Sequence, residues 1–83
     1  MKNRSRDDIL VQILSGLEEP ESKTFIMYRT HLSYSQLKAY LEFMVIKGLI
    51  YERGGRWIMT AKGRAYLKAL REANQILNNN NDG

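Results

Sequence analysis

The chain has 83 residues, of which 43% are hydrophobic and 27% are charged, and it contains one proline and no cysteine. This length allows one domain, and this composition is typical of a folded chain rather than a disordered one. The missing cysteines exclude a disulfide scaffold, a zinc knuckle and a thiol nucleophile. No apolar run approaches the ~18 residues that a membrane span requires, so we expect a small cytoplasmic domain.

The net charge of +4 hides a strongly basic middle section. Residues 23–71 contain ten basic and two acidic side chains, a net charge of +8, whereas the segments before and after them each carry a net charge of −2. Such an asymmetry indicates a polyanionic partner, although a solvated basic surface would also account for it. Nucleic acid is favoured over a membrane surface because no predicted helix combines a broad basic face with a large apolar one.

The first predicted helix begins at Ser5. Ser5 and Asp8 have the spacing of a capping box, and acidic side chains in the first turn suit the positive end of the helix dipole. The apolar residues that recur at helical spacing behind this cap are Ile9, Leu10, Ile13, Leu14 and Leu17. Pro20 ends the pattern, because proline disfavours a helical residue before it. A shorter helix is expected over residues 23–30.

A tight turn at residues 31–32 separates that helix from a third one. Ser33 begins the third helix with a second capping box, in which Gln36 is the reciprocal partner. The positions that face the core are Leu37, Leu41 and Met44. Gly48 lies just past the expected end of this helix, where glycine is common.

Two β-type runs follow, over residues 49–53 and 56–60. Gly54-Gly55 separates them, and both glycines can adopt the positive φ that a two-residue hairpin turn requires. Thr60 is placed to cap a last helix that runs to about Leu77. The asparagine-rich segment behind it is expected to fray.

The predicted order is helix, helix, tight turn, helix, hairpin and helix. A hairpin directly behind a helix-turn-helix is the winged-helix arrangement, in which the third helix enters a DNA groove. The predicted fold class is therefore mainly α with a small β-hairpin (α+β), a winged helix-turn-helix. We expect one domain over residues 5–77, with flexible ends at 1–4 and 78–83.

Four short motifs support this arrangement: KTFIMY at residues 23–28, LSYSQLKAYL at 32–41, GLI at 48–50 and WIMTAKG at 57–63. Together with the first helix they resemble the small archaeal winged-helix DNA-binding proteins, which are chromatin-associated or regulatory. The resemblance implies a homodimer formed through the last helix, residues 61–77, with the helix begun by Ser33 in the major groove. The sequence departs from the family pattern in its short last helix and in the apolar residues Phe25 and Ile46.

Side chains for catalysis do not assemble in this sequence. His31 is the single histidine, and it is better explained as a turn residue than as a general base or a pH switch. Asp7 and Asp8 are explained by the helix dipole rather than by a metal ion. Gly54-Gly55 lacks the spacing and the lysine of a phosphate-binding loop. We therefore expect no enzyme activity, no metal and no cofactor.

The candidates for DNA contact lie on the third helix and at the hairpin tip. At 100° per residue, the side of the helix opposite its core-facing positions carries Ser35, Ala39, Glu42 and Ile46, with Gln36 and Lys38 flanking it. Such side chains can bond base edges, as glutamine does with adenine, lysine with guanine and glutamate with cytosine. Arginines at a hairpin tip suit the sugar–phosphate backbone. The candidate DNA-binding residues are Tyr34, Ser35, Gln36, Lys38, Ala39, Glu42, Arg53 and Arg56. The alternatives are an ordinary polar helix surface and a hairpin kept soluble by its cations.

The last helix carries an apolar stripe with alternating spacings of three and four residues. The candidate dimer-interface residues are Tyr66, Leu70, Ala73 and Leu77. Such a stripe also packs on its own domain in many proteins, but the C-terminal half of this helix should extend beyond the other elements, which favours a dimer.

The leading functional hypothesis is double-stranded DNA binding by a dimeric transcription regulator or chromatin protein associated with the nucleoid. A winged-helix adapter that binds proteins is the alternative, for which Phe25 and Ile46 are the best sequence evidence. The basic middle section would also permit RNA binding.

Overall fold

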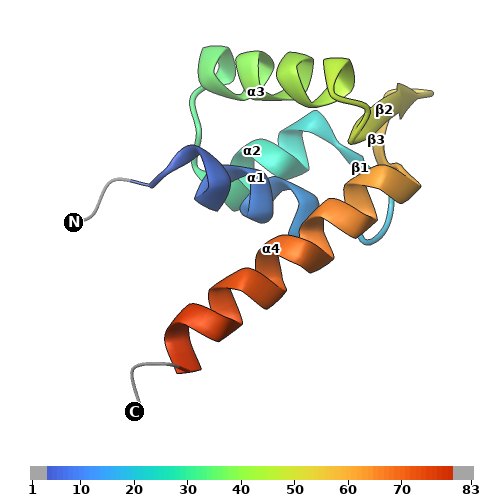
Figure 1. Ribbon diagram of the computed structural model, residues 1–83. Helices are drawn as coiled ribbons and strands as arrows, with labels where there is room; N and C mark the ends of the chain where they lie inside the picture. Colours follow the sequence, from blue (N-terminus) through green and yellow to red (C-terminus); the bar gives the residue numbers. More distant parts are fainter. Residues whose placement is uncertain (1–3, 80–83) are drawn as a thin grey trace.

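Residues 4–79 are described by the computed structural model, and they form four helices and three short strands. In chain order these are α1 (Arg6–Ser15), β1 (Glu21–Ser22), α2 (Lys23–Thr30), α3 (Tyr34–Ile46), β2 (Ile50–Arg53), β3 (Arg56–Met59) and α4 (Ala61–Asn79). Helices α1, α2 and α3 gather around one core, the strands lie at one end of α3, and α4 crosses below α1 (Figure 1). The predicted mainly-α fold with a small β element is confirmed.

Both predicted capping boxes are present. The backbone amide of Asp8 donates to Ser5 Oγ at 3.1 Å, and Asp8 Oδ2 accepts from the Ser5 amide at 3.0 Å. At the start of α3 the Gln36 amide donates to Ser33 Oγ at 3.1 Å, and Gln36 Oε1 accepts from the Ser33 amide at 2.9 Å. These bonds satisfy amide groups that have no partner within a helix, and they fix where each helix begins.

The turn between α2 and α3 is built around His31, as expected for a local turn residue. Its backbone is left-handed, with φ 59° and ψ 29°, and its amide donates to the Met27 carbonyl at 2.8 Å. Arg4 supports the same corner, because its guanidinium donates to the Thr30 carbonyl at 2.5 Å and to Gln12 Oε1 at 2.7 Å. Arg4 was expected to belong to a flexible end, and its side chain instead ties the start of α1 to the end of α2.

The sheet has three strands in the order β1-β3-β2, not the two that the sequence indicates. In β1, Glu21 lies opposite Trp57 and Ser22 lies opposite Arg56. The hairpin itself is confirmed, with Gly54 at φ 61° and Gly55 at φ 82°. Each of its strands is one residue shorter at the outer end than the predicted ranges 49–53 and 56–60.

The core is apolar and continuous. Its buried members from α1 and α2 include Leu10, Ile13, Leu14 and Ile26, and those from α3 are Leu37, Leu41 and Met44. The predicted phase of α3 is therefore confirmed. Thr30 is the one polar residue buried in the described part of the chain, and its hydroxyl donates to the Ile26 carbonyl at 2.8 Å.

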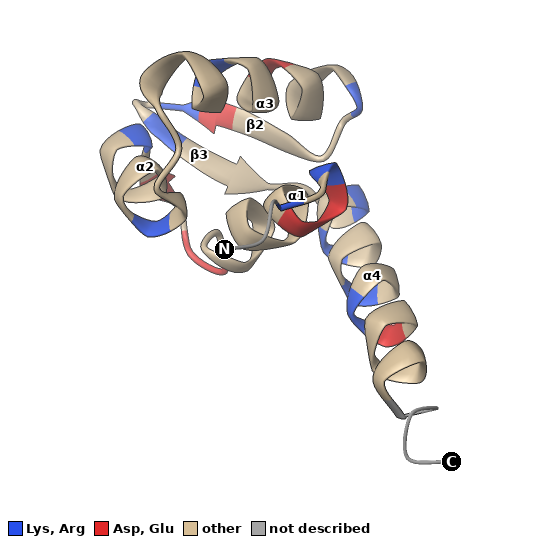
Figure 2. Cartoon of the chain, turned by 90° about the vertical axis from the view of Figure 1, so that its left-hand side faces the viewer, with Lys and Arg blue, Asp and Glu red and all other residues tan. Residues whose placement is uncertain are grey.

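The position of α4 is set at its start and along its first half. Thr60 Oγ1 donates to the Gly48 carbonyl at 2.6 Å and accepts from the Gly63 amide at 2.9 Å, which confirms the predicted cap. Leu67 is buried in the core. The helix then leaves the body of the domain and projects away from it (Figures 1 and 2). It continues to Asn79, beyond the predicted end near Leu77, and the rest of the tail expected to fray (80–83) lies outside the described residues, as does the N-terminal end at 1–3.

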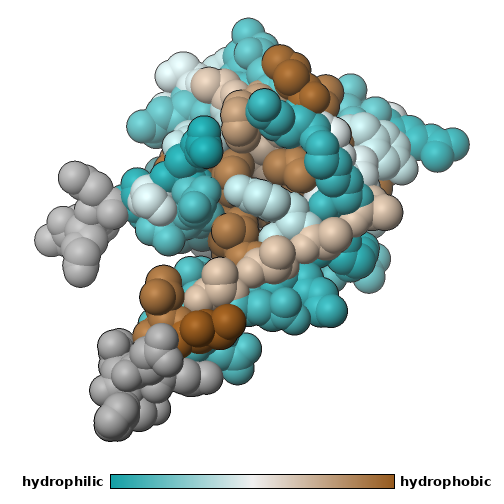
Figure 3. Space-filling model, viewed as in Figure 1, coloured by the Kyte–Doolittle hydropathy of each residue, from teal (hydrophilic) through white to brown (hydrophobic). Residues whose placement is uncertain are grey.

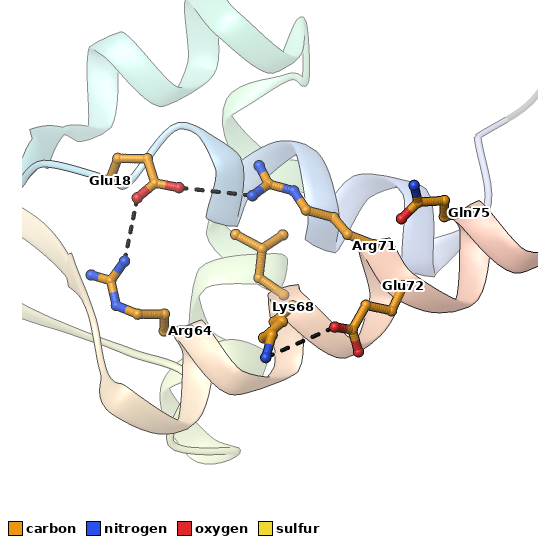
Figure 4. Close-up of a pocket in the computed structure, with 7 residues that line it drawn as sticks. Glu18, Arg64, Lys68, Arg71, Glu72 and Gln75 are labelled. Atoms are coloured by element: carbon orange, nitrogen blue, oxygen red, sulfur yellow. Dashed lines mark hydrogen bonds and ion pairs between the residues drawn. The ribbon is translucent and has the colours of Figure 1, made fainter.

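Ion pairs hold α4 against the end of α1. We call the three side chains that form them, Glu18, Arg64 and Arg71, the charged clasp. The Glu18 carboxylate lies 3.3 Å from the Arg64 guanidinium and 3.9 Å from that of Arg71 (Figure 4). Arg71 also donates to Ser15 Oγ at 2.9 Å. All three charged side chains of the clasp are more than half exposed, so solvent screens these ion pairs and the apolar contact at Leu67 dominates the packing.

Candidate nucleic-acid interface

Helix α3 presents an unpartnered face on the side away from the core. Ser35, Ala39, Glu42 and Ile46 are all exposed there, as their spacing predicts. The capping box at Ser33 begins the helix at a defined residue, and Leu37, Leu41 and Met44 fix its rotation from below. A rigid helix with one exposed face is the element that helix-turn-helix proteins place in a DNA groove.

Gln36 forms part of the cap of α3, and the predicted contact of Gln36 with adenine did not take this role into account. Its Oε1 accepts the Ser33 amide in the capping box, while its Nε2 has no hydrogen bond within the described part of the chain. A bidentate contact to adenine uses both ends of the amide. Gln36 can therefore donate one bond to a base without disturbing α3, and a bidentate contact requires opening the cap.

Lys38 and Glu42 form an ion pair one turn apart on α3. Lys38 Nζ lies 3.6 Å from Glu42 Oε2, and both side chains are more than half exposed. Glu42 would repel a phosphate backbone on its own, and this ion pair supplies a neutralising cation from its own helix. The pair is weak at this exposure, so Lys38 can exchange Glu42 for a base or a phosphate, and Glu42 can exchange Lys38 for the amine of a base.

Lys23 joins this surface, although it is not among the DNA-binding residues predicted from the sequence. It stands in the first turn of α2, and its ammonium lies 4.5 Å from the centroid of the Tyr34 ring and 3.4 Å from the Tyr34 hydroxyl. A cleft of about 180 Å³ separates α3 from β3 here, and Lys23, Tyr34, Lys38 and Trp57 are among its lining residues. The signals in the sequence were its membership of the basic middle section and its place in the KTFIMY motif.

Arg53 and Arg56 lie directly opposite each other across the hairpin, on either side of the Gly54-Gly55 turn. Both are exposed, and among residues 4–79 no carboxylate forms an ion pair with either. Arg56 donates one bond, to the Pro20 carbonyl at 3.3 Å. Lys and Arg positions lie along the hairpin, α2 and α3 (Figure 2). The structure thus places the predicted residues of α3 and the two arginines on neighbouring elements, and Lys23 and Tyr34 link α2 to α3 beside them.

Comparisons with known proteins agree with this geometry. A family model described as winged helix-turn-helix matches residues 3–78. The chain belongs to the winged helix-turn-helix family. It is 29% identical over 76 residues to uncharacterized protein MJ0287 of Methanocaldococcus jannaschii, an alignment that covers 90% of this chain and 78% of that protein.

The winged-helix fold is also found in a solved structure. The crystal structure of Sso10a-2, a DNA-binding protein from Sulfolobus solfataricus, matches with a TM-score of 0.80 at 24% identity, over 95% of this chain and 87% of that one. The likeness shows a common fold. The sequence resemblance to archaeal winged-helix proteins is confirmed.

The predicted dimer residues on α4 divide into two groups. Tyr66 and Leu70 are half-buried, and Tyr66 packs against the core of its own domain. Ala73 and Leu77 are exposed, Leu77 at 65%, on the projecting half of the helix. Hydrophobic surface is concentrated at this end of α4 (Figure 3). Only the outer part of the predicted stripe is thus fully available to a partner.

The described residues contain neither a metal-binding cluster nor a membrane-spanning helix. Within residues 4–79 there is no group of three or more His, Cys, Asp or Glu side chains that could hold a metal ion. None of the helices in the described chain is both long enough and apolar enough to cross a membrane.

Proposed function

We propose that the protein binds double-stranded DNA as a homodimer, with α3 in the major groove and the wing against the sugar–phosphate backbone. The winged helix-turn-helix family and the fold shared with a DNA-binding protein support DNA as the partner. The candidate contacts on α3 are Tyr34, Ser35, Gln36, Lys38, Ala39 and Glu42. A transcription regulator or a chromatin protein of the nucleoid would both use this surface.

The observation that carries the proposal is the pair of opposed arginines at the tip of the wing. Like charges directly opposite each other in an antiparallel sheet destabilise it. Arg53 and Arg56 occupy such a position, and no carboxylate of the described chain neutralises them. A phosphate backbone would supply the missing negative charge. The two arginines repel each other and do not help the domain to fold, so their presence at the tip is explained by DNA binding.

Dimerisation is proposed through the projecting half of α4. Leu77 and Ile76 are 65% and 61% exposed, and Leu70 and Ala73 continue the stripe toward the domain. Pairing two such helices would cover this apolar surface and place two copies of α3 on one DNA duplex. Recognition helices of a dimer commonly meet the major groove about 34 Å apart, one turn of DNA.

Direct binding measurements test the proposal. Fluorescence anisotropy with labelled duplex DNA, single-stranded DNA and RNA of the same length and sequence should show the tightest binding to the duplex. Selection from random duplexes would then distinguish a regulator from a chromatin protein, because a regulator returns an inverted repeat and a chromatin protein returns no preferred site. Equal affinity for the three polymers, preference for RNA, or no binding to any of them would contradict the proposal.

Protein binding is a second candidate function, favoured by one specific observation. Ile46 is 80% exposed at the end of α3, next to the 43% exposed Val45, and Phe25 on α2 is 39% exposed. Apolar side chains at these positions suit an adapter that docks on another protein. An adapter would show no duplex binding in the anisotropy experiment.

A further inference from the structure

A second cavity lies where α1, α3 and α4 meet, on a different flank of α3 from Ser35, Lys38 and Glu42. It has a volume of about 240 Å³ and is lined by Leu10, Phe43, Lys47, Leu49, Lys62 and Tyr66. We call it the three-helix pocket. The space-filling view shows hydrophobic surface in a hollow between α3 and α4 (Figure 3). The DNA-binding proposal makes no use of this pocket.

The inner wall of the three-helix pocket is apolar. Leu10 and Leu49 belong to the core, with 1% and 4% of their surface exposed. Phe43 and Tyr66 pack against that core and are themselves only partly buried. An apolar cavity of about 150 Å³ is large enough to bind benzene. The pocket can therefore hold one aromatic ring, with space left for a polar group at its mouth.

The mouth of the pocket carries two cations that come from different helices. Lys47 caps the C-terminal end of α3, and its ammonium lies 5.7 Å from the centroid of the Phe43 ring. Lys62 stands in the first turn of α4, and its side chain crosses over Gly48, where an added Cβ would lie 3.9 Å from the Lys62 ammonium nitrogen. Gly48 follows Lys47 in the chain, so the two lysines flank one opening.

Neither of these lysines is neutralised within residues 4–79. The ion pairs of that part of the chain involve Lys38, Arg64, Lys68 and Arg71, and none involves Lys47 or Lys62. An apolar cavity with two free ammonium groups at its rim is complementary to a molecule with a small ring and one negative charge. Pockets for small ligands typically combine such an apolar wall with a few convergent polar groups.

We propose that the three-helix pocket binds a small aromatic monocarboxylate, with its ring against Leu10, Phe43, Leu49 and Tyr66 and its carboxylate between Lys47 and Lys62. A ligand held in this way touches all three helices at once. It would stabilise their packing, because any molecule that binds the folded state alone raises the free energy of unfolding.

Sodium benzoate is the probe for this proposal. A titration followed by amide NMR of the full chain should show saturable changes grouped at residues 43–49 and 62–66, and benzoate should raise the thermal midpoint. Sodium acetate has the carboxylate without the ring, and benzyl alcohol has the ring without the charge. Both should bind at least tenfold more weakly than benzoate.

A double variant separates this site from general attraction to a basic protein. Lys47→Gln/Lys62→Gln should weaken benzoate binding at least tenfold and leave the weak binding of benzyl alcohol unchanged. Lys38→Gln/Lys68→Gln removes the same charge from the same two helices outside the pocket, and it should bind benzoate like the wild type. All four positions are exposed, so these variants should fold.

Three results would overturn the proposal. The first is a change in amide chemical shifts that does not saturate as benzoate is added. The second is a change that spreads over all lysine-rich surfaces. The third is an unchanged affinity of Lys47→Gln/Lys62→Gln for benzoate. Each of these readouts is independent of DNA, so a failure here leaves the proposed DNA binding untouched.

Discussion

The Cα of Gly63 lies directly against the backbone carbonyl of Leu49, so that a Cβ at Gly63 would collide with that oxygen. This contact presses the first turn of α4 onto the chain between α3 and β2. Gly63 therefore serves packing within its own domain, although its spacing suggests that it continues the apolar stripe of α4.

Substitution of Gly63 by alanine should destabilise the fold. The colliding atom is backbone and cannot move aside as a side chain can, and overpacking of this kind costs about 1–3 kcal/mol. Thermal unfolding should show a fall of about 4–8 °C in the midpoint for each kcal/mol lost. Gly16→Ala is the matched control, because the added methyl there collides only with the flexible side chain of Arg29 and makes an ordinary 3.5 Å contact with the Ile13 carbonyl. Equal midpoints for the two variants would show that the contact is unimportant.

The wing variant Arg53→Gln/Arg56→Gln should bind DNA more weakly without loss of stability. Affinity should fall for every duplex sequence alike, and the slope of log affinity against log salt should decrease by about 0.9 for each lost phosphate contact. The thermal midpoint should stay constant or rise, because the substitution removes a like-charge pair.

Arg64→Gln/Lys68→Gln is the control for the wing variant, since it removes the same charge from α4. It should retain the wild-type salt slope. A wing variant that loses discrimination between sites, rather than affinity for all sites, would reverse the roles assigned to the wing and to α3.

Lys38 and Glu42 should affect DNA binding in opposite directions. Lys38→Ala should erode the preference for a selected site over random duplex by about 1–3 kcal/mol if Lys38 contacts a base edge. Glu42→Gln removes a negative charge that would face the phosphates in the proposed complex, so it should strengthen binding to random duplex. Competition titrations with both duplexes measure the two effects. If both variants weaken both duplexes equally, α3 does not read sequence.

Dimerisation should depend on the outer half of α4. Leu70→Gln/Leu77→Gln removes apolar burial of about 1.5–3 kcal/mol for each leucine that the interface covers completely. Light scattering at micromolar concentration should then report the mass of a dimer for the wild type and of a monomer for the variant. Ile46→Gln alters an apolar residue on α3 that is even more exposed than Leu77, and it should leave the mass unchanged. A monomeric wild type would refute the proposed interface.

The substitution Ile46→Glu should barely change the free energy of unfolding. Ile46 is 80% exposed, and exposed substitutions typically change stability by less than about 0.5 kcal/mol. Thermal unfolding measures this directly. A drop of several degrees in the midpoint would mean that another element, or a second copy, covers this residue in solution.

Features fixed by neighbouring residues were predictable from the sequence. The caps at Ser5, Ser33 and Thr60, the phase of α3 and the Gly54-Gly55 turn depend on local spacing, and all of them are present. The strand β1 was missed because two residues carry no periodic pattern. Its existence depends on β3, more than thirty positions further along the chain.

In the candidate interface, too, local spacing predicted some features, whereas others depend on contacts that only the folded chain makes. The positions on α3 that face away from the core followed from helical spacing alone. The ion pair between Lys38 and Glu42 and the bond from Ser33 to Gln36 limit what these side chains can offer DNA, and residue type does not reveal such competition. The stacking of Lys23 on Tyr34 joins two elements separated by the turn, so only the folded chain could show it.

Ser22 is at once the last residue of β1 and the residue that caps α2. Its backbone pairs with Arg56 at the base of the wing, and its hydroxyl accepts the Phe25 amide at 3.1 Å. No linker stands between sheet and helix, so the wing and α2 share a rigid joint rather than a hinge. A force that tilts the wing must tilt α2 with it, and a bound duplex that does not match their fixed angle would itself have to bend.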